Sequence, residues 1–215
     1  ARLLALHSSA ALVINVFEHW TSRDAAPLLG ALGLEGSAAS ITFERPFETG
    51  LPGDPPYVDV AVELTSGRLV AIESKFTEWL APRPPNGGTF KSKYFADGIE
   101  HWAASGLPRC QAFAADVQAR RERFKHLHAA QILKQALALA LVRRPASLYY
   151  LYYDVECAES KVHRAEIERC RARLTPEIEL AATSYQELFR RLDADERVDR
   201  EYVGYLRSRY FPPRR

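Results

Sequence analysis

The chain has 215 residues, with 29 basic and 27 acidic side chains, a net charge of +2 and 47% hydrophobic residues. This balance is typical of an ordinary globular domain and excludes disordered and collagen-like chains. The near-neutral total also means that bulk charge does not indicate nucleic-acid binding by itself. We therefore expect a single domain over residues 1–215, long enough to bury a core without disulfides or a structural metal.

The three cysteines, Cys110, Cys157 and Cys170, are odd in number and lack Cys-x-x-Cys spacing. This argues against both a disulfide framework and a zinc cluster, and favours a reducing cytoplasm. The longest apolar runs, residues 10–14 and 136–142, are far shorter than the roughly 20 residues that cross a bilayer. We expect a cytoplasmic protein without a membrane span and see no secretory signal.

The N-terminal third predicts two helices followed by one strand. Ser8 or Ser9 can cap a helix that runs to about Trp20 with an apolar stripe at helical spacing. A short helix over residues 24–32 ends at Gly33, a plausible C-cap. Residues 40–47 read as a strand that ends near Pro46.

A hairpin over residues 57–76 is the clearest strand signal in the chain. Two alternating apolar segments are separated by Thr65, Ser66 and Gly67, and glycine supplies the left-handed conformation that a three-residue loop needs. This loop pairs Leu64 with Arg68.

The second half alternates helices and strands. We expect helices over residues 92–104 and 109–144, the latter broken near 124–127, and then a strand over 147–155 that is apolar enough to be covered on both faces. A helix over 160–174, a strand over 178–183 and two closing helices follow, the first capped by Ser184 with Glu187 three residues on. The pattern predicts an α/β fold with a central mixed β-sheet flanked by helices.

The hairpin register places its charges in unusual positions. It sets Asp59 opposite Glu73, with Lys75 on the same face. Opposed like charges destabilise an antiparallel pair unless something compensates them. A Mg²⁺ or Mn²⁺ ion is the natural compensator, since both prefer oxygen ligands. The alternative is a solvated hairpin face that carries charge for solubility.

Asp59, followed after the turn by Glu73, Ser74 and Lys75 with apolar residues at 70 and 72, resembles the signature of the PD-(D/E)XK nuclease superfamily. The order of helices and strands is also similar to that fold over most of the chain. In particular the chain resembles a bacterial branch of restriction endonuclease-like proteins whose first helix carries Ser-Ser and Asn-x-Phe. One departure is Val58, where the superfamily motif has proline.

The resemblance implies a restriction endonuclease-like fold and a role for each matching residue. Asp59 and Glu73 would coordinate the metal together with the Ser74 backbone carbonyl. Lys75 would position the attacking water or stabilise charge on the scissile phosphate. Glu18 matches a helical acid that many members direct at the metal, with Glu44 as its rival and a plain surface glutamate as the other alternative.

A later helix offers further candidates. Gln131 resembles a polar residue that several branches place beside the active site, against the alternative of an ordinary helix-face glutamine, and Lys134 could join it one turn on. For nucleic-acid contact we single out basic side chains in three places, with a solvated helix face as the alternative for the arginine-rich run. They are Lys91 and Lys93 in the loop over residues 86–93, Lys134, and the run of Arg120, Arg121, Arg123 and Lys125.

These features predict a Mg²⁺- or Mn²⁺-dependent deoxyribonuclease that hydrolyses phosphodiester bonds, with DNA as its partner and a homodimer left open. A catalytically inactive module that keeps the fold and binds nucleic acid or protein is the alternative. An RNA-directed nuclease is a third, weaker interpretation.

Overall fold

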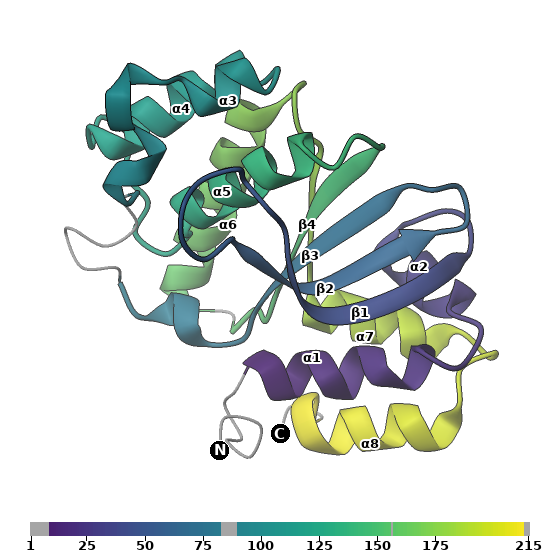
Figure 1. The fold of residues 1–215 in the computed structure, drawn as a ribbon. Helices are drawn as coiled ribbons and strands as arrows, with labels where there is room; N and C mark the ends of the chain where they lie inside the picture. Colours follow the sequence, from purple (N-terminus) through teal and green to yellow (C-terminus); the bar gives the residue numbers. More distant parts are fainter. Residues whose placement is uncertain (1–8, 83–89, 156, 213–215) are drawn as a thin grey trace.

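The computed structural model describes residues 9–82, 90–155 and 157–212, apart from the side chain of Asp97 (Figure 1). Ser8 and residues 86–89 of the predicted lysine loop lie outside these ranges. Within these ranges α1 begins at Ser9, one of the two residues predicted to start the first helix.

A five-stranded sheet forms the centre of the molecule, with strand order β1-β2-β3-β4-β5. The first three strands are antiparallel and the last three are parallel, so the predicted mixed sheet is confirmed. The strands are β1 (Ala38–Pro46), β2 (Tyr57–Leu64), β3 (Leu69–Lys75), β4 (Ala146–Tyr152) and β5 (Leu180–Ser184).

The β2–β3 hairpin has the predicted register. The Leu64 N–H donates to the Arg68 carbonyl, and Gly67 adopts a φ of 84°. The ladder runs from Glu63 opposite Leu69 to Val60 opposite Ile72. Because side chains alternate along a strand, this register decides which residues of β3 face each side of the sheet.

Helices cover both faces of the sheet (Figure 1). One layer contains α3 (His101–Ala104), α4 (Pro108–Gln118), α5 (Ala129–Ala140) and α6 (Ala158–Leu174). The other contains α1 (Ser9–Phe17), α2 (Ala26–Leu32), α7 (Tyr185–Ala194) and α8 (Arg200–Tyr210). Each layer closes a separate core, the first around Trp102 and Phe113 and the second around Phe17 and Tyr185.

The predicted helix over residues 92–104 is wrong as a continuous element. The chain forms two 3-10 turns, η4 (Ser92–Tyr94) and η5 (Ala96–Gly98), before the short helix α3. Tyr94 and Phe95 pack against Trp102 with ring centroids 5.7 and 5.8 Å apart. Gly98 adopts a φ of 67°, which is outside the helical region.

The break predicted near residues 124–127 is present but longer, because α4 ends at Gln118 and α5 starts at Ala129. The buried Glu166 carboxylate on α6 holds this connection. It accepts the backbone N–H groups of Lys125, His126 and Leu127 at 2.5, 2.8 and 2.9 Å. These bonds replace the helical ones.

Candidate active site

The hairpin brings Asp59, Glu73 and Lys75 together at the ends of β2 and β3. Glu73 and Lys75 are alternate residues of β3 and share one face, where the Lys75 ammonium donates to Glu73 Oε1. Asp59 lies one residue beyond the Val60–Ile72 pair, at the open end of the hairpin. Its Oδ2 accepts the Ser74 N–H at 2.6 Å. The Glu73 side chain is only 4% exposed and that of Lys75 18%. The predicted trio is therefore one largely buried cluster.

Two glutamines of α5 fix the Glu73 carboxylate from the helical layer. Gln131 Nε2 donates to Glu73 Oε1 at 2.7 Å. Gln135 Nε2 donates to Glu73 Oε2 at 2.5 Å and to the Tyr57 carbonyl at 2.9 Å. Gln131 thus lies beside the predicted site. Gln135 was missed, although its spacing of four residues from Gln131 on an apolar helix could have indicated it.

The opposite face of β3 is anchored on α7. Ser74 points away from Glu73, and its hydroxyl lies 2.7 Å from the hydroxyl of the fully buried Tyr185. Tyr185 opens α7, which begins there because Ser184 Oγ accepts the Glu187 N–H at 3.1 Å as an N-cap. Sequence reasoning found this cap but not the contact with the hairpin.

The Ser74 carbonyl is directed at the Asp59 side of β3. The carbonyl of the next residue, Lys75, accepts the Tyr153 N–H beyond the end of β4 at 2.8 Å. Successive carbonyls of an extended strand point to opposite edges, so the Ser74 carbonyl faces the edge of β2. The N–H of Ser74, which bonds Asp59, faces the same edge. The three predicted oxygen donors therefore come from adjoining positions.

The cluster has perturbed proton affinities. Burial and the Glu73 carboxylate raise the pKa of Asp59, against the opposing effects of Lys75 and the Ser74 N–H. Burial by itself would lower the pKa of Lys75, but Glu73 and Asp59 outweigh it and raise that pKa. Lys75 therefore stays an ammonium, while Asp59 resists carrying its negative charge beside Glu73.

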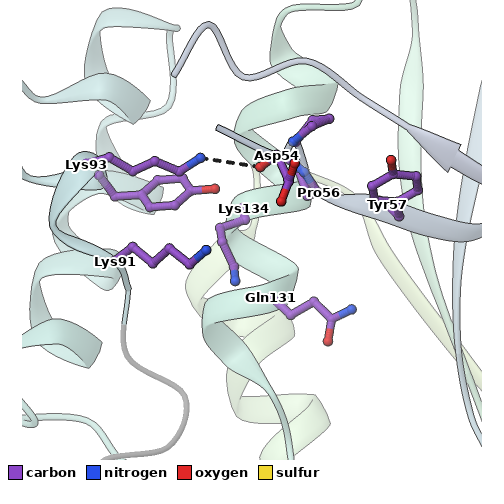
Figure 2. Close-up of a pocket in the computed structure, with 9 residues that line it drawn as sticks. Asp54, Pro56, Tyr57, Lys91, Lys93, Gln131 and Lys134 are labelled. Atoms are coloured by element: carbon purple, nitrogen blue, oxygen red, sulfur yellow. Dashed lines mark hydrogen bonds between the residues drawn. The ribbon is translucent and has the colours of Figure 1, made fainter. Parts of the chain in front are cut away.

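A pocket of about 240 Å³ adjoins the cluster (Figure 2). Gln131 lines it and also donates to Glu73, so the two features share a residue. Lys91, Lys93 and Lys134 line it as well. Lys93 Nζ donates to the Pro52 carbonyl at 2.6 Å and holds the loop before β2. The structure thus gathers three of the predicted nucleic-acid contacts next to the carboxylates.

Comparison with protein families matched residues 2–211 to the family described as "Restriction Endonuclease associating with ARP". The chain belongs to this family. Its mixed sheet flanked by helices is the restriction endonuclease-like fold that the hairpin motif predicted. Comparison with curated proteins and with solved structures gave no match. None of the helices in the described ranges is long and apolar enough to cross a membrane.

The arginine-rich run of this restriction endonuclease-like chain lies elsewhere, in the connection between α4 and α5. Arg121 Nε bonds Asp116 at 2.8 Å, and Arg123 Nε donates to the carbonyl of Arg120 at 3.3 Å. Arg121 and Arg123 line a separate surface depression that also contains acidic residues. Lys125 is exposed and follows this run. The role of Arg120, Arg121, Arg123 and Lys125 in binding nucleic acid stays a prediction.

Glu18 and Glu44 are the two candidates for a third acid at the site, and both are exposed. Glu18 is exposed and opens the 3-10 turn η2 (Glu18–Trp20) after α1. Its rival Glu44 lies on β1 between the ladder pairs Phe43–Val60 and Arg45–Val58. The charge of Glu44 adds to the effects that raise the pKa of Asp59. Glu44 adopts a φ of 49°, an uncommon conformation for a residue with a side chain. Of these two candidates, Glu44 is therefore the one whose charge acts on Asp59, in addition to that of Glu73.

The donor set of the cluster suits a small hard cation. Within the described residues, no three His, Cys, Asp or Glu side chains gather as a metal cage. Two carboxylates and a carbonyl are instead typical of Mg²⁺, which keeps several waters and demands few protein ligands. A cation would also offset the repulsion that raises the pKa of Asp59. The residues present therefore fit Mg²⁺ or Mn²⁺ better than zinc.

Proposed function

We propose that this protein is a Mg²⁺- or Mn²⁺-dependent deoxyribonuclease that hydrolyses phosphodiester bonds. The observation that carries the proposal is the largely buried cluster of Asp59, Glu73 and Lys75, in which two carboxylates and an ammonium share one end of the central hairpin. Membership of a restriction endonuclease family supports the same class of reaction.

Asp59, Glu73 and the Ser74 carbonyl would hold the cation. Bound there, Mg²⁺ supplies Lewis acidity, which activates water and neutralises charge that develops on the phosphate. Gln131 and Gln135 orient Glu73 through both of its oxygens, and the Ser74 N–H orients Asp59. The chain thus fixes its carboxylates before any ligand arrives, which lowers the cost of binding.

Lys75 contributes a permanent positive charge beside these carboxylates. Its raised pKa keeps the ammonium protonated at neutral pH, so it serves as a hydrogen-bond donor and electrostatic partner rather than as a general base. An ammonium in this position would orient the attacking water or stabilise the scissile phosphate. The adjoining lysines 91, 93 and 134 would hold further phosphates of the strand.

The test is cleavage of supercoiled plasmid, of linear duplex DNA and of a single-stranded oligonucleotide with Mg²⁺ or Mn²⁺. We expect Lys75→Gln and Asp59→Asn to lower the rate by about 100-fold or more, the scale typical of lost transition-state donors and proton-transfer groups. Lys161→Gln, which removes an exposed lysine on α6, should cleave like the wild type. Nicking of the closed circle would identify internal cutting.

A non-catalytic module would give a different result. If folded wild type and Lys75→Gln are indistinguishable in cleavage, the nuclease proposal is wrong. Titration with Mn²⁺, followed by its electron paramagnetic resonance, gives a second readout that needs no turnover. Binding that Asp59→Asn removes supports the metal site, whereas equal binding by both proteins contradicts it.

A further inference from the structure

Tyr57 exposes its ring at the edge of the lysine pocket. The residue is 49% exposed, in contrast to the fully buried Tyr185. It opens β2 two positions before Asp59, and its carbonyl accepts Gln135 Nε2 at 2.9 Å. The backbone that carries the ring is therefore fixed to the same glutamine that holds Glu73, while the ring itself remains open to a ligand.

The pocket has a basic wall opposite this ring. Figure 2 shows the side chains of Lys91 and Lys93 on one side, Tyr57 on the other, and Lys134 between them. Among the described residues that line the pocket, Asp54 is the single acid against three lysines, which gives this lining a net positive charge. Lys93 donates to the Pro52 and Asp54 carbonyls. Lys91 and Lys134 line the same pocket and are our candidates for contact with a phosphate.

We propose that this pocket binds one unpaired nucleotide of single-stranded DNA, with the base stacked on Tyr57 and the phosphate at Lys91 and Lys134. The inference rests on the proposed function in taking DNA as the ligand, and it adds the substrate class. Aromatic platforms beside a basic groove are the usual means of holding single strands, because every base has a stacking face.

An intact duplex fits the same surface poorly. Within a helix each base is covered by its neighbours, so a protruding tyrosine finds no free face on which to stack. The pocket, of about 240 Å³, is also of the size of a single nucleotide and too small for a helix to enter. The geometry therefore favours strands that are already unpaired at the cleavage position.

Fluorescence anisotropy with labelled dT20 and a 20-base-pair duplex tests this, with Ca²⁺ replacing Mg²⁺ to suppress cleavage. We expect Tyr57→Val to weaken binding of dT20 by about 5- to 100-fold, the loss of one stacked base, and to leave duplex binding unchanged. Tyr57→Phe keeps the ring and should bind like the wild type. Lys134→Gln should flatten the dependence of log K on log salt by about 0.7.

Tyr205→Leu is the matched control, because Tyr205 is 42% exposed on α8 and lines no part of the pocket. Unchanged dT20 binding by Tyr57→Val would overturn the inference, as would duplex binding as tight as dT20 binding by the wild type. Tighter binding of rU20 than of dT20 would overturn it too, by assigning the pocket to RNA.

The two proposals fail separately. Tyr57-dependent binding of dT20 without any metal-dependent cleavage contradicts the nuclease chemistry and supports the nucleotide pocket. If cleavage needs Lys75 but dT20 binding does not depend on Tyr57, the proposed nucleotide pocket is wrong and the proposed nuclease activity is supported.

Discussion

Two acids on β2, Asp59 and Glu63, respond to the fold in opposite ways. Burial and Glu73 raise the pKa of Asp59. Hydrogen bonds from Arg144 and Arg45 lower the pKa of Glu63 to about 2. A carboxyl group whose pKa is raised by folding lowers the stability as the pH climbs from its pKa in the unfolded state to its pKa in the folded state. A carboxyl group whose pKa is lowered by folding contributes stability, which is lost only as the pH falls toward 2 for Glu63. At neutral pH Asp59 therefore destabilises the metal-free fold, and Glu63 stabilises it.

Removal of each charge should consequently shift stability in opposite directions. At pH 8 in EDTA, we expect Asp59→Asn to raise the melting temperature, since asparagine still accepts the Ser74 N–H without a charge. Glu63→Gln should lower the unfolding free energy by about 1 kcal/mol. Thermal unfolding followed by circular dichroism measures both. A lower melting temperature for Asp59→Asn would mean that its carboxylate contributes stability after all.

We expect Gln135 to contribute more to stability than Gln131 does. Gln135→Leu removes the amide that serves both Glu73 Oε2 and the Tyr57 carbonyl, and should cost about 1–3 kcal/mol in unfolding free energy. Gln131→Leu should cost less, because Lys75 also donates to Glu73 Oε1. Urea unfolding in EDTA compares the two variants. Equal losses would show that the Tyr57 contact contributes nothing.

At the scale of elements, prediction succeeded where local chemistry decides the structure. The hairpin register follows from Gly67 and from the alternation of β2 and β3, and this register brings Asp59 beside Glu73. The prediction of a continuous helix over residues 92–104 was wrong because Tyr94 and Phe95 pack against Trp102, and these contacts hold the chain in turns. Gln131 was predicted from the family resemblance alone, because its contact with Glu73 spans 58 positions. Gln135 was not part of that resemblance, and its contact with Glu73 spans 62 positions, so only its spacing from Gln131 could have indicated it.

The connection between α4 and α5 depends on Glu166, which is 4% exposed. Glu166→Ala leaves the N–H groups of residues 125–127 without their acceptor and should cost about 3 kcal/mol. Glu168→Ala removes a neighbouring exposed glutamate and should change stability by less than about 0.5 kcal/mol.

Hydrogen exchange separates this contact from a general loss of stability. We expect Glu166→Ala to speed exchange at amides 126 and 127 far more than at the buried amides of β3. Uniform acceleration across both segments would contradict a local role for the carboxylate.

At the scale of the whole molecule, the candidate site draws on both helical layers. Gln131 and Gln135 reach Glu73 from α5 on one face of the sheet. Tyr185 reaches Ser74 from α7 on the other face. Strand β3 joins the two because its successive residues point to opposite faces.

This arrangement predicts that metal binding stabilises the complete fold. The donor set comes from two strands and is absent from the unfolded chain, so Mn²⁺ at 100 times its dissociation constant should add about 2.7 kcal/mol to the unfolding free energy. Differential scanning calorimetry measures the shift, and Asp59→Asn should abolish it. A shift that persists in Asp59→Asn would place the ion elsewhere.

The position of Tyr185 late in the chain has a consequence for biosynthesis. The hairpin and α5 precede α7 in the chain, so they leave the ribosome before Tyr185, the partner of Ser74, has been made. The hydrogen bond between Ser74 and Tyr185 can therefore form only after α7 has been made. The residues of the site are thus synthesised before Tyr185, which binds Ser74 from α7. A chain still bound to the ribosome before this point lacks that contact, whereas the released chain has it.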